Sequence, residues 1–253
     1  MQNVTDPVLY WHKLAHVFQA VYAFRAAHNG DPGWVPVPIG EFLSKERAEK
    51  IAAAIEGCPQ SPEASGQDGS LPQESTSSLS TTDRWGNAVV LTHSNGSSAG
   101  VVTPGLGFLY NNHMHNFDPR PGQRNSIAVG KLREHGTPLV MWFRNGRLVG
   151  VDGSLSRFAV TADLQVTLRI NAGQEVQSAI AAPRLHAEYL HGQLYLEPEF
   201  PQEIVDGLLD RGWKAARMPM TAPLGMIRAG EDGEAIPGLD PRGGQGLWPS
   251  THE

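Results

Sequence analysis

Hydrophobic and polar residues alternate with two different periods along this chain, and the period predicts where helices and strands form. In residues 10–28, apolar residues recur at helical spacing without any Gly or Pro, which predicts one long helix with a broad buried face. Residues 29–33, with the sequence N-G-D-P-G, end this helix. A second helix is expected over residues 43–56, with Ser44 as its N-terminal cap and Gly57 at its end.

Two segments show the pattern of β-hairpins. The cluster D-R-W-G-N at residues 83–87 separates two runs rich in Thr, Ser, Val and Leu, and it predicts a hairpin in which Thr76 lies opposite Ser94. Directly opposed residues have Cβ atoms roughly 4.5–5.5 Å apart on one face, so the two hydroxyls are expected within reach of each other. Asn145-Gly146, between two apolar runs in residues 138–150, predicts a second hairpin.

The rest of the chain alternates between helical and extended patterns. Helices are expected over residues 156–170, 175–182 and 202–211, and strands over residues 108–110 and 193–196 and in short pieces from Met218 onward. Strand pairs followed by helices and further strands are typical of sheets covered by helices, which is an α+β architecture.

A polar segment divides the chain. Residues 58–75 consist mainly of Pro, Ser, Gly, Gln and Glu, and they contain too few apolar residues to offset the entropy of ordering. We therefore expect a helical segment (residues 1–57), a flexible linker (residues 58–75) and a larger domain (residues 76–253). The composition of the linker is compatible with a self-cleavage loop and equally with a simple spacer.

Composition and charge exclude several classes of function. The chain has 253 residues, of which 40% are hydrophobic and 18% charged, as in ordinary globular proteins. A net charge of −6 without any block of basic residues argues against binding to nucleic acid. No apolar stretch approaches 18 residues and no secretory signal is visible, so we expect a cytoplasmic protein without membrane contact. The single Cys58 excludes an internal disulfide.

The histidines do not form a convincing metal site. His12, His16 and His28 lie on a strongly apolar helix, where packing or surface roles are expected. His113 and His115 lack a third ligand at a defined spacing. We therefore expect neither a metal nor any other cofactor.

Thr76 is the candidate nucleophile. A Thr whose α-amino group is released by backbone cleavage carries nucleophile and base in one residue, because the amine takes the hydroxyl proton. Thr76 begins a predicted strand directly after the linker, which suits this chemistry. The alternative is an ordinary Ser/Thr-rich strand without catalytic function.

Five stretches of the sequence together favour the catalytic interpretation. They are T-S-S-L-S-T-T-D-R-W-G-N-A-V-V-L-T-H-S-N (residues 76–95), G-V-V-T-P-G-L-G-F-L-Y-N-N-H-M-H-N-F (100–117), F-D-P-R-P-G-Q-R-N-S-I-A-V-G-K (117–131), A-P-R-L-H (182–186) and D-P-R (240–242). In combination they resemble the γ-glutamyltransferase (γ-glutamyltranspeptidase) family of N-terminal-nucleophile hydrolases. Members of that family cleave themselves immediately before a Thr, and the corresponding bond is Ser75–Thr76.

The resemblance implies a fold and a missing part. The expected fold is the four-layer αββα sandwich of N-terminal-nucleophile hydrolases, with residues 1–57 similar to the end of the large subunit and residues 76–253 similar to the small subunit. Most of the family's large subunit has no counterpart in this sequence, so the fold is expected to be incomplete without it. A missing large-subunit polypeptide and a second copy of this chain are the candidate macromolecular partners.

The resemblance also assigns candidate site residues. Thr76 corresponds to the nucleophile and Ser94 to the hydroxyl that hydrogen-bonds it, which makes these two the expected catalytic residues. The positions expected to bind substrate are Asn95, Asn116, Glu134 and His135. Gly153-Ser154 is the nearest remnant of the family's Gly-Gly pair, whose backbone N–H groups form the oxyanion hole.

Three of these positions depart from the family pattern. Asn116 stands where the family has an Asp that holds the substrate α-amino group. Glu134-His135 replaces two serines that contact the α-carboxylate, so a glutamyl carboxylate is expected to meet repulsion from Glu134. At Gly153-Ser154 the Gly pair is not intact, and losing one oxyanion donor typically costs about 10²–10³ in rate.

Three functions are compatible with these observations. The main expectation is a γ-glutamyl amide hydrolase and transferase of glutathione metabolism, made as a self-processing zymogen and acting on a small-molecule γ-glutamyl amide. The second is an amidase or acylase of the same fold with a different acyl group, as Asn116 and Glu134-His135 suggest. The third is a truncated, catalytically silent paralogue.

Overall fold

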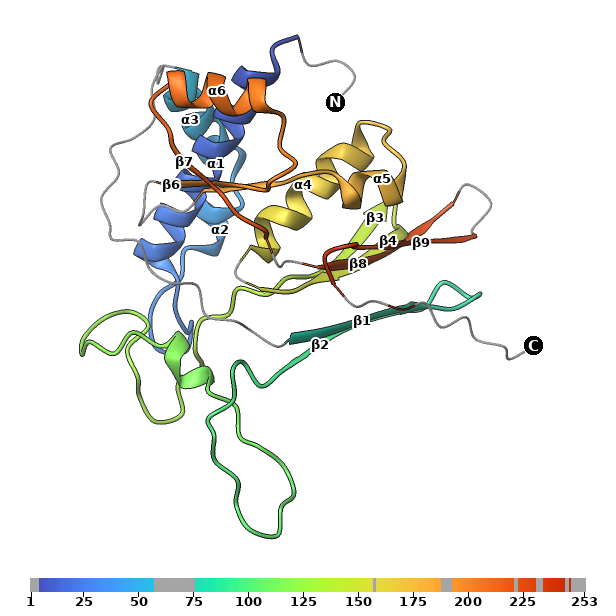
Figure 1. Cartoon of the computed structure of the whole chain (residues 1–253). Coiled ribbons are helices and arrows are strands. Elements are labelled where there is room, and N and C mark those ends of the chain that lie inside the picture. The colour runs from blue at the N-terminus through green and yellow to red at the C-terminus, as the bar shows by residue number, and fades with distance from the viewer. Residues whose placement is uncertain are drawn as a thin grey trace.

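The computed structural model of the chain describes residues 5–56, 76–156, 158–187, 193–220, 223–230, 234–243 and 246 (Figure 1). The predicted linker (residues 58–75) lies outside the described residues, so its expected flexibility stays a prediction. Among the described helices, none combines the length and the apolar character needed to cross a lipid bilayer.

The N-terminal segment forms the predicted helices. Helix α1 (Pro7–His28) begins slightly earlier than expected, because Asp6 caps it by accepting a hydrogen bond from the Leu9 amide at 2.9 Å. The short helix α2 (Ile39–Phe42) precedes α3 (Lys45–Glu56). Ser44 caps α3 as predicted, since its Oγ accepts from the Arg47 amide at 3.2 Å.

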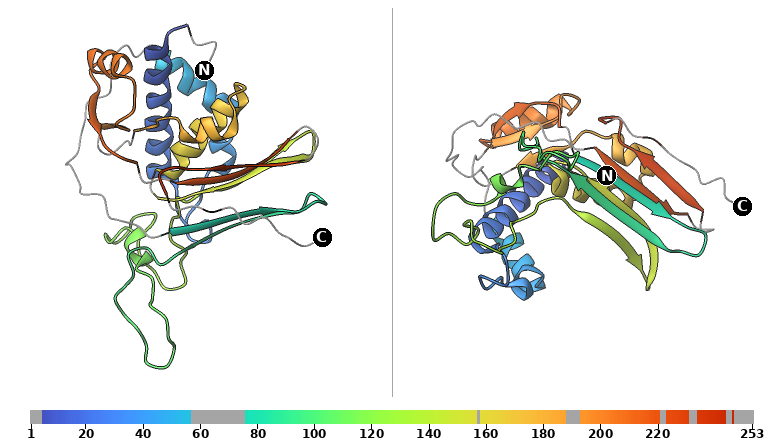
Figure 2. Two further views of the ribbon diagram at one scale, coloured as in Figure 1. Left: turned by 45° about the vertical axis from the view of Figure 1, so that its right-hand side comes forward. Right: turned by 90° about the horizontal axis from the view of Figure 1, so that it is seen from below.

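Two sheets lie one over the other in the larger domain (Figures 1 and 2). The first is a hairpin of β1 (Thr76–Thr82) and β2 (Ala88–Ser94). The second has the order β3-β4-β8-β9 and consists of β3 (Leu139–Arg144), β4 (Arg147–Ser154), β8 (Leu224–Ala229) and β9 (Ala235–Leu239), all antiparallel. Gly153 lets the sheets approach closely, because a Cβ at this position would overlap Ser78 Oγ of the first sheet.

Helices cover the other face of the second sheet. They are α4 (Ala159–Asn171) and α5 (Val176–Ala181), close to the predicted bounds. Val166, Ile180 and Leu224 are completely buried between these helices and the sheet. Three of the four expected layers, one helical and two of sheet, are therefore present. On the outer face of β1 and β2 the described residues supply no helix, and Leu79 and Leu91 are 55% and 54% exposed there.

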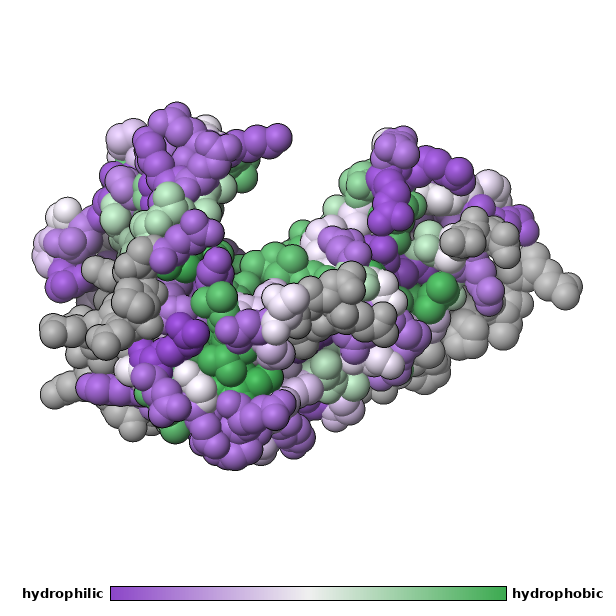
Figure 3. Space-filling model, turned by 90° about the horizontal axis from the view of Figure 1, so that it is seen from above, coloured by the Kyte–Doolittle hydropathy of each residue, from purple (hydrophilic) through white to green (hydrophobic). Residues whose placement is uncertain are grey.

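A second core joins α1 to the remaining elements. These are β5 (Leu185–Ala187), β6 (Gln193–Leu196), α6 (Gln202–Asp210) and β7 (Lys214–Arg217), with the sheet order β5-β6-β7. Trp11 and Phe18 of α1 pack into this core with Leu208 and Trp213. Figure 3 shows apolar residues gathered near the middle of the helical side of the molecule, between more hydrophilic ends.

The predicted hairpins are confirmed and one predicted strand is wrong. Thr76 pairs with Ser94 in the observed register, and the second hairpin turns at Asn145 and Gly146, whose φ values are +52° and +75°. Residues 108–110 do not form a strand, because they lie in an exposed loop with only a single bridge between Val102 and Leu109. The sequence patterns did not predict the short strands β5 and β7.

Candidate active site

The start of β1 and the end of β2 bring two hydroxyl groups together. Thr76 Oγ1 lies 2.9 Å from Ser94 Oγ, as the hairpin register predicts. Ser94 Oγ also accepts a hydrogen bond from the Gly96 amide at 2.9 Å. This second bond fixes the Ser94 side chain against the loop that follows β2, so that Ser94 in turn orients the Thr76 hydroxyl.

Gly96 is required by the shape of that loop. Its φ is +60°, and a Cβ would overlap the Oδ1 of Asn112, which accepts from the Ser97 amide at 3.1 Å. Any side chain at residue 96 would therefore displace the amide that holds Ser94.

Thr76 and Ser94 open into a cavity of about 560 Å³. Its wall is built from α1, the paired ends of β1 and β2, the 3₁₀ turn η1 (His113–Asn116), the loop of residues 133–137, and Ser156. Figure 1 shows η1 and this end of the hairpin close to the lower end of α1. Five of the eight predicted site residues line this one cavity: Thr76, Ser94, Asn116, Glu134 and His135.

The other three predicted residues do not line it. The Asn95 carbonyl holds the loop by accepting from the Ser98 and Asn112 amides at 3.0 and 3.3 Å. Gly153 faces the first sheet, and the buried Ser154 Oγ donates to Asp163 Oδ2 at 2.9 Å. Gly153 and Ser154 thus lie within the second sheet and outside the cavity lining, and an oxyanion role for their backbone N–H groups stays a prediction.

Ser156 is the residue of this region that reaches the cavity. It follows β4 and has φ +80°, in the left-handed region that a Ser rarely adopts. Sequence patterns did not single it out, since a positive φ at a non-glycine residue leaves no clear trace in composition.

The cavity also contains an ion pair that the sequence did not predict. Nη2 of Arg25, on α1, forms an ion pair with Oε1 of Glu134, and the two side chains are 27% and 24% exposed. Gly136 leaves room for the guanidinium, because a Cβ there would lie 3.2 Å from Arg25 Nη2. The charge of Glu134 is thus compensated, whereas the sequence suggested an uncompensated anion.

Hydrogen bonds select the tautomers of three histidines beside this pair. Arg133 Nη2 donates to His113 Nδ1 at 3.1 Å, and the Thr137 amide donates to His135 Nδ1 at 2.9 Å. Neutral His113 and His135 therefore carry their protons on Nε2. His115 Nδ1 instead donates to the Asn112 carbonyl at 2.8 Å. Within the described parts of the chain, no group of three or more His, Cys, Asp or Glu residues could hold a metal ion.

The histidines of α1 have packing roles, as expected. His12 is 1% exposed, and its Nδ1 accepts from Trp213 Nε1 at 2.9 Å. The His16 ring lies against the same indole, with ring centroids 5.0 Å apart.

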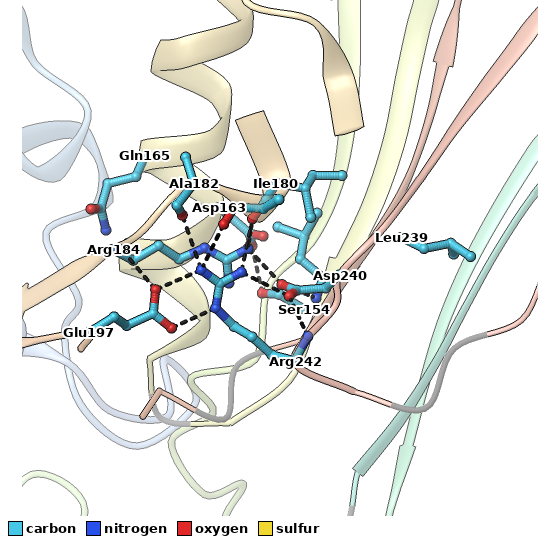
Figure 4. A network of polar contacts seen from close by, with 12 residues as sticks. Ser154, Asp163, Gln165, Ile180, Ala182, Arg184, Glu197, Leu239, Asp240 and Arg242 are labelled. Atoms are coloured by element: carbon cyan, nitrogen blue, oxygen red, sulfur yellow. Dashed lines mark hydrogen bonds and ion pairs between the residues drawn. The ribbon is translucent and has the colours of Figure 1, made fainter. Parts of the chain in front are cut away.

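The motifs A-P-R-L-H and D-P-R meet in a buried ion network away from the cavity lining (Figure 4). Arg184 Nη2 bonds to Asp240 Oδ2 at 2.6 Å, and these side chains are 1% and 0% exposed. Arg242 bonds to Asp240 at 2.9 Å and to Glu197 at 2.5 Å. These motifs therefore serve the fold.

Two further carboxyl groups are buried between β4 and α4. Burial, together with the neighbouring charge of Asp152, raises the pKa of Asp163 to about 8. Burial also raises the pKa of Asp152 to about 6, while the indole N–H of Trp142 bonds to its carboxylate and acts in the opposite direction. Near neutral pH this region therefore holds a proton that an exposed Asp would have lost.

Comparison with known proteins finds a matching family model and similar relatives. The family model described as Gamma-glutamyltranspeptidase matches residues 1–249. The "Acylase ACY 1 proenzyme" of Pseudomonas sp. (strain V22) is 34% identical over 223 residues, which cover 86% of this chain and 39% of the relative. The "Glutathione hydrolase proenzyme" of Escherichia coli (strain K12) is 30% identical over 246 residues, which cover 90% of this chain and 42% of the relative.

Solved structures share the fold. The cephalosporin acylase from Bacillus halodurans superposes with a TM-score of 0.78 and 26% identity, covering 94% of this chain and 44% of that one. The T380A mutant of the Helicobacter pylori gamma-glutamyltranspeptidase gives a TM-score of 0.61 and 27% identity, covering 66% of this chain and 99% of that chain. The chain spans about two-fifths of the length of the curated relatives it matches.

Proposed function

Because this chain belongs to the gamma-glutamyltranspeptidase family of N-terminal-nucleophile hydrolases, we propose that it is an amide hydrolase and acyltransferase acting through Thr76. Cleavage of the Ser75–Thr76 bond would release the α-amino group that serves as base. The observation that carries this proposal is the 2.9 Å contact between Thr76 Oγ1 and Ser94 Oγ at the wall of a cavity of about 560 Å³.

The reaction follows from this arrangement. The Thr76 hydroxyl attacks the carbonyl carbon of the amide while the free α-amine of the same residue takes the hydroxyl proton. Collapse of the tetrahedral intermediate expels the amine of the substrate, to which the α-ammonium group of Thr76 returns the proton, and leaves an ester on Thr76. Water or a second amine then attacks this ester, which regenerates the hydroxyl and releases the acid or the transferred amide.

We propose a γ-glutamyl amide as the substrate. Among the described residues that line the cavity, Arg25 and Arg133 carry positive charge and Glu134 carries negative charge. With neutral histidines the formal charge of this wall is positive, which favours an acyl group that bears a carboxylate.

A second polypeptide is the proposed partner. Apolar side chains on the outer face of β1 and β2 are about half exposed. A large-subunit polypeptide that covers this face would supply the layer that the described residues lack.

Self-cleavage and turnover test this function directly. Purified protein should separate into two fragments on a denaturing gel, and intact mass spectrometry should place the junction between Ser75 and Thr76. The processed protein should hydrolyse γ-glutamyl-p-nitroanilide. Thr76→Ala should remove both activities, whereas Thr82→Ala, on the same face at the other end of β1, should retain them. A single uncut chain after long incubation would instead identify a silent paralogue.

An acylase with a different acyl group is the second candidate. The Glu134 carboxylate already forms an ion pair with the Arg25 guanidinium at the cavity wall, and the Asn116 side chain there is neutral. A curated relative at 34% identity is named an acylase. Turnover of other acyl amides by a processed protein that leaves γ-glutamyl-p-nitroanilide intact would favour this candidate.

A further inference from the structure

The Arg25–Glu134 ion pair lies in the wall of the same cavity as Thr76. Arg25 belongs to α1, whereas Glu134 belongs to the loop of residues 133–137, so separate elements supply the two partners. Both side chains keep about a quarter of their surface exposed, so a molecule in the cavity can reach them.

The surroundings of Arg25 hold its guanidinium in place. The group lies 5.8 Å from the centre of the Tyr22 ring, and its Nη2 would lie 3.2 Å from a Cβ at residue 136. The Glu134 amide donates to Asn125 Oδ1 at 3.1 Å, which anchors the loop that carries the carboxylate. Guanidinium groups bind carboxylates in a planar, often bidentate geometry, and Glu134 shows that this one accepts a carboxylate.

We propose that Glu134 is a specificity-determining residue, because it competes with a substrate carboxylate for Arg25. The proposal rests on the proposed function of the cavity. A tethered carboxylate is present at an effective concentration in the millimolar range or above, so a substrate carboxylate must displace it before binding to Arg25. Glu134 therefore weakens the preference of the cavity for γ-glutamyl groups over acyl groups without the α-carboxylate.

Two matched substrates isolate this effect. γ-Glutamyl-p-nitroanilide and 4-aminobutyryl-p-nitroanilide have the same amino group, the same acyl carbon chain and the same p-nitroaniline leaving group. They differ only in the α-carboxylate. The ratio of their kcat/KM values therefore measures how well the cavity accepts that carboxylate. Glu134→Gln should raise this ratio in favour of the γ-glutamyl substrate by about tenfold or more, because Arg25 is then available to the substrate.

Arg25 must be the group that receives the carboxylate. We therefore expect the double variant Arg25→Gln/Glu134→Gln to lose the gain and return to within about threefold of the wild-type ratio, since both charges of the pair are absent. Glu46→Gln is the matched control, because it removes one carboxylate from an exposed pair with Lys50 on α3 and should leave the ratio unchanged. An unchanged ratio in Glu134→Gln, or an equal gain in the double variant, would overturn the proposal.

Binding measurements separate this proposal from the proposed reaction. Calorimetric titration with glutamate and with 4-aminobutyrate gives the same comparison without turnover. If no variant hydrolyses either anilide but Glu134→Gln still gains about tenfold in affinity for glutamate over 4-aminobutyrate, the specificity role stands and the catalytic proposal fails. If the anilides are hydrolysed and neither ratio responds to Glu134→Gln, the catalytic proposal stands and the specificity role fails. Failure of both ligands to bind to every variant would also overturn the specificity role.

Discussion

Two arginine–carboxylate pairs in this protein have the same chemistry and opposite surroundings. Arg184 and Asp240 are 1% and 0% exposed, and they belong to a network that includes Glu197 and Arg242 (Figure 4). Arg25 and Glu134 are 27% and 24% exposed and lie in the wall of the cavity. The comparison indicates that surroundings, more than the type of ion pair, decide whether a pair is sealed within the fold or stays accessible from a cavity.

The buried pair is tied to the backbone from several directions. Arg184 Nη2 also donates to the Ile180 carbonyl at 2.7 Å, and Asp240 Oδ2 also accepts from the Leu224 amide at 3.2 Å. These bonds connect Arg184, directly before β5, to α5, and Asp240, directly after β9, to β8. In a water-excluded interior the loss of one charge leaves the other uncompensated, which costs far more than the same loss at a wet surface.

The largest expected effect follows from removing one buried charge. Asp240→Asn should lower the free energy of unfolding by about 3–5 kcal/mol, because Arg184 then stays buried without its carboxylate. Urea denaturation followed by circular dichroism measures this loss. Asp206→Asn, which changes an exposed carboxylate on α6, should leave the unfolding midpoint within error. An equally small change in Asp240→Asn would contradict the structural role of the network.

A smaller effect is expected at the cavity, and it should appear in rate without loss of stability. Ser94→Ala removes the hydroxyl that orients Thr76 and should slow processing and turnover by about 10²-fold, or about 2.7 kcal/mol of activation free energy. Timed gels and p-nitroanilide release measure both rates. Ser94→Thr keeps the hydroxyl and should recover most of the activity, and Ser80→Ala on the same hairpin should have no effect on either rate. Unimpaired processing in Ser94→Ala would exclude the orienting role.

The buried carboxyls beside α4 should make stability depend on pH. In the folded protein the Asp163 carboxyl group has a pKa of about 8, whereas an Asp carboxyl group in the unfolded chain has a pKa near 4. The folded state therefore binds more protons between these values, and the free energy of unfolding falls as pH rises across them, by at most about 1.4 kcal/mol per pH unit for one proton. Asp163→Asn should flatten this dependence in denaturation curves measured from pH 5 to pH 8. A parallel pH dependence in both proteins would show that Asp163 is not the group that titrates.

The smallest expected effect concerns the Arg25–Glu134 pair of the cavity wall. Glu134→Gln should change the free energy of unfolding by about 1 kcal/mol or less, because water screens the Arg25 pair. Thermal unfolding at neutral pH measures this value alongside Asp240→Asn. A loss as large as that of Asp240→Asn would mean that the cavity pair is also a structural element, and that its exposure is not decisive.

Local structure was predictable to the extent that it depends on neighbouring residues. The Asp83–Asn87 turn fixed the pairing of Thr76 with Ser94, and Asn145-Gly146 fixed the second hairpin through two positive φ values. Such turns act on the residues directly beside them, so their outcome is present in a short stretch of sequence. The strand expected at residues 108–110 failed because apolar residues in an exposed loop give the same short pattern as a strand.

The sequence alone determined the nucleophile candidate, its hydroxyl partner and the family, because these depend on hairpin register and on motifs within single stretches. Three features became apparent only from the packing of the folded chain: Arg25 neutralises Glu134, Ser156 and not Gly153-Ser154 reaches the cavity, and the A-P-R-L-H and D-P-R motifs form a buried network. The physical reason is that ion pairs and cavity walls join residues far apart in the chain. Their partners are set by how helices and sheets pack, which no local pattern encodes.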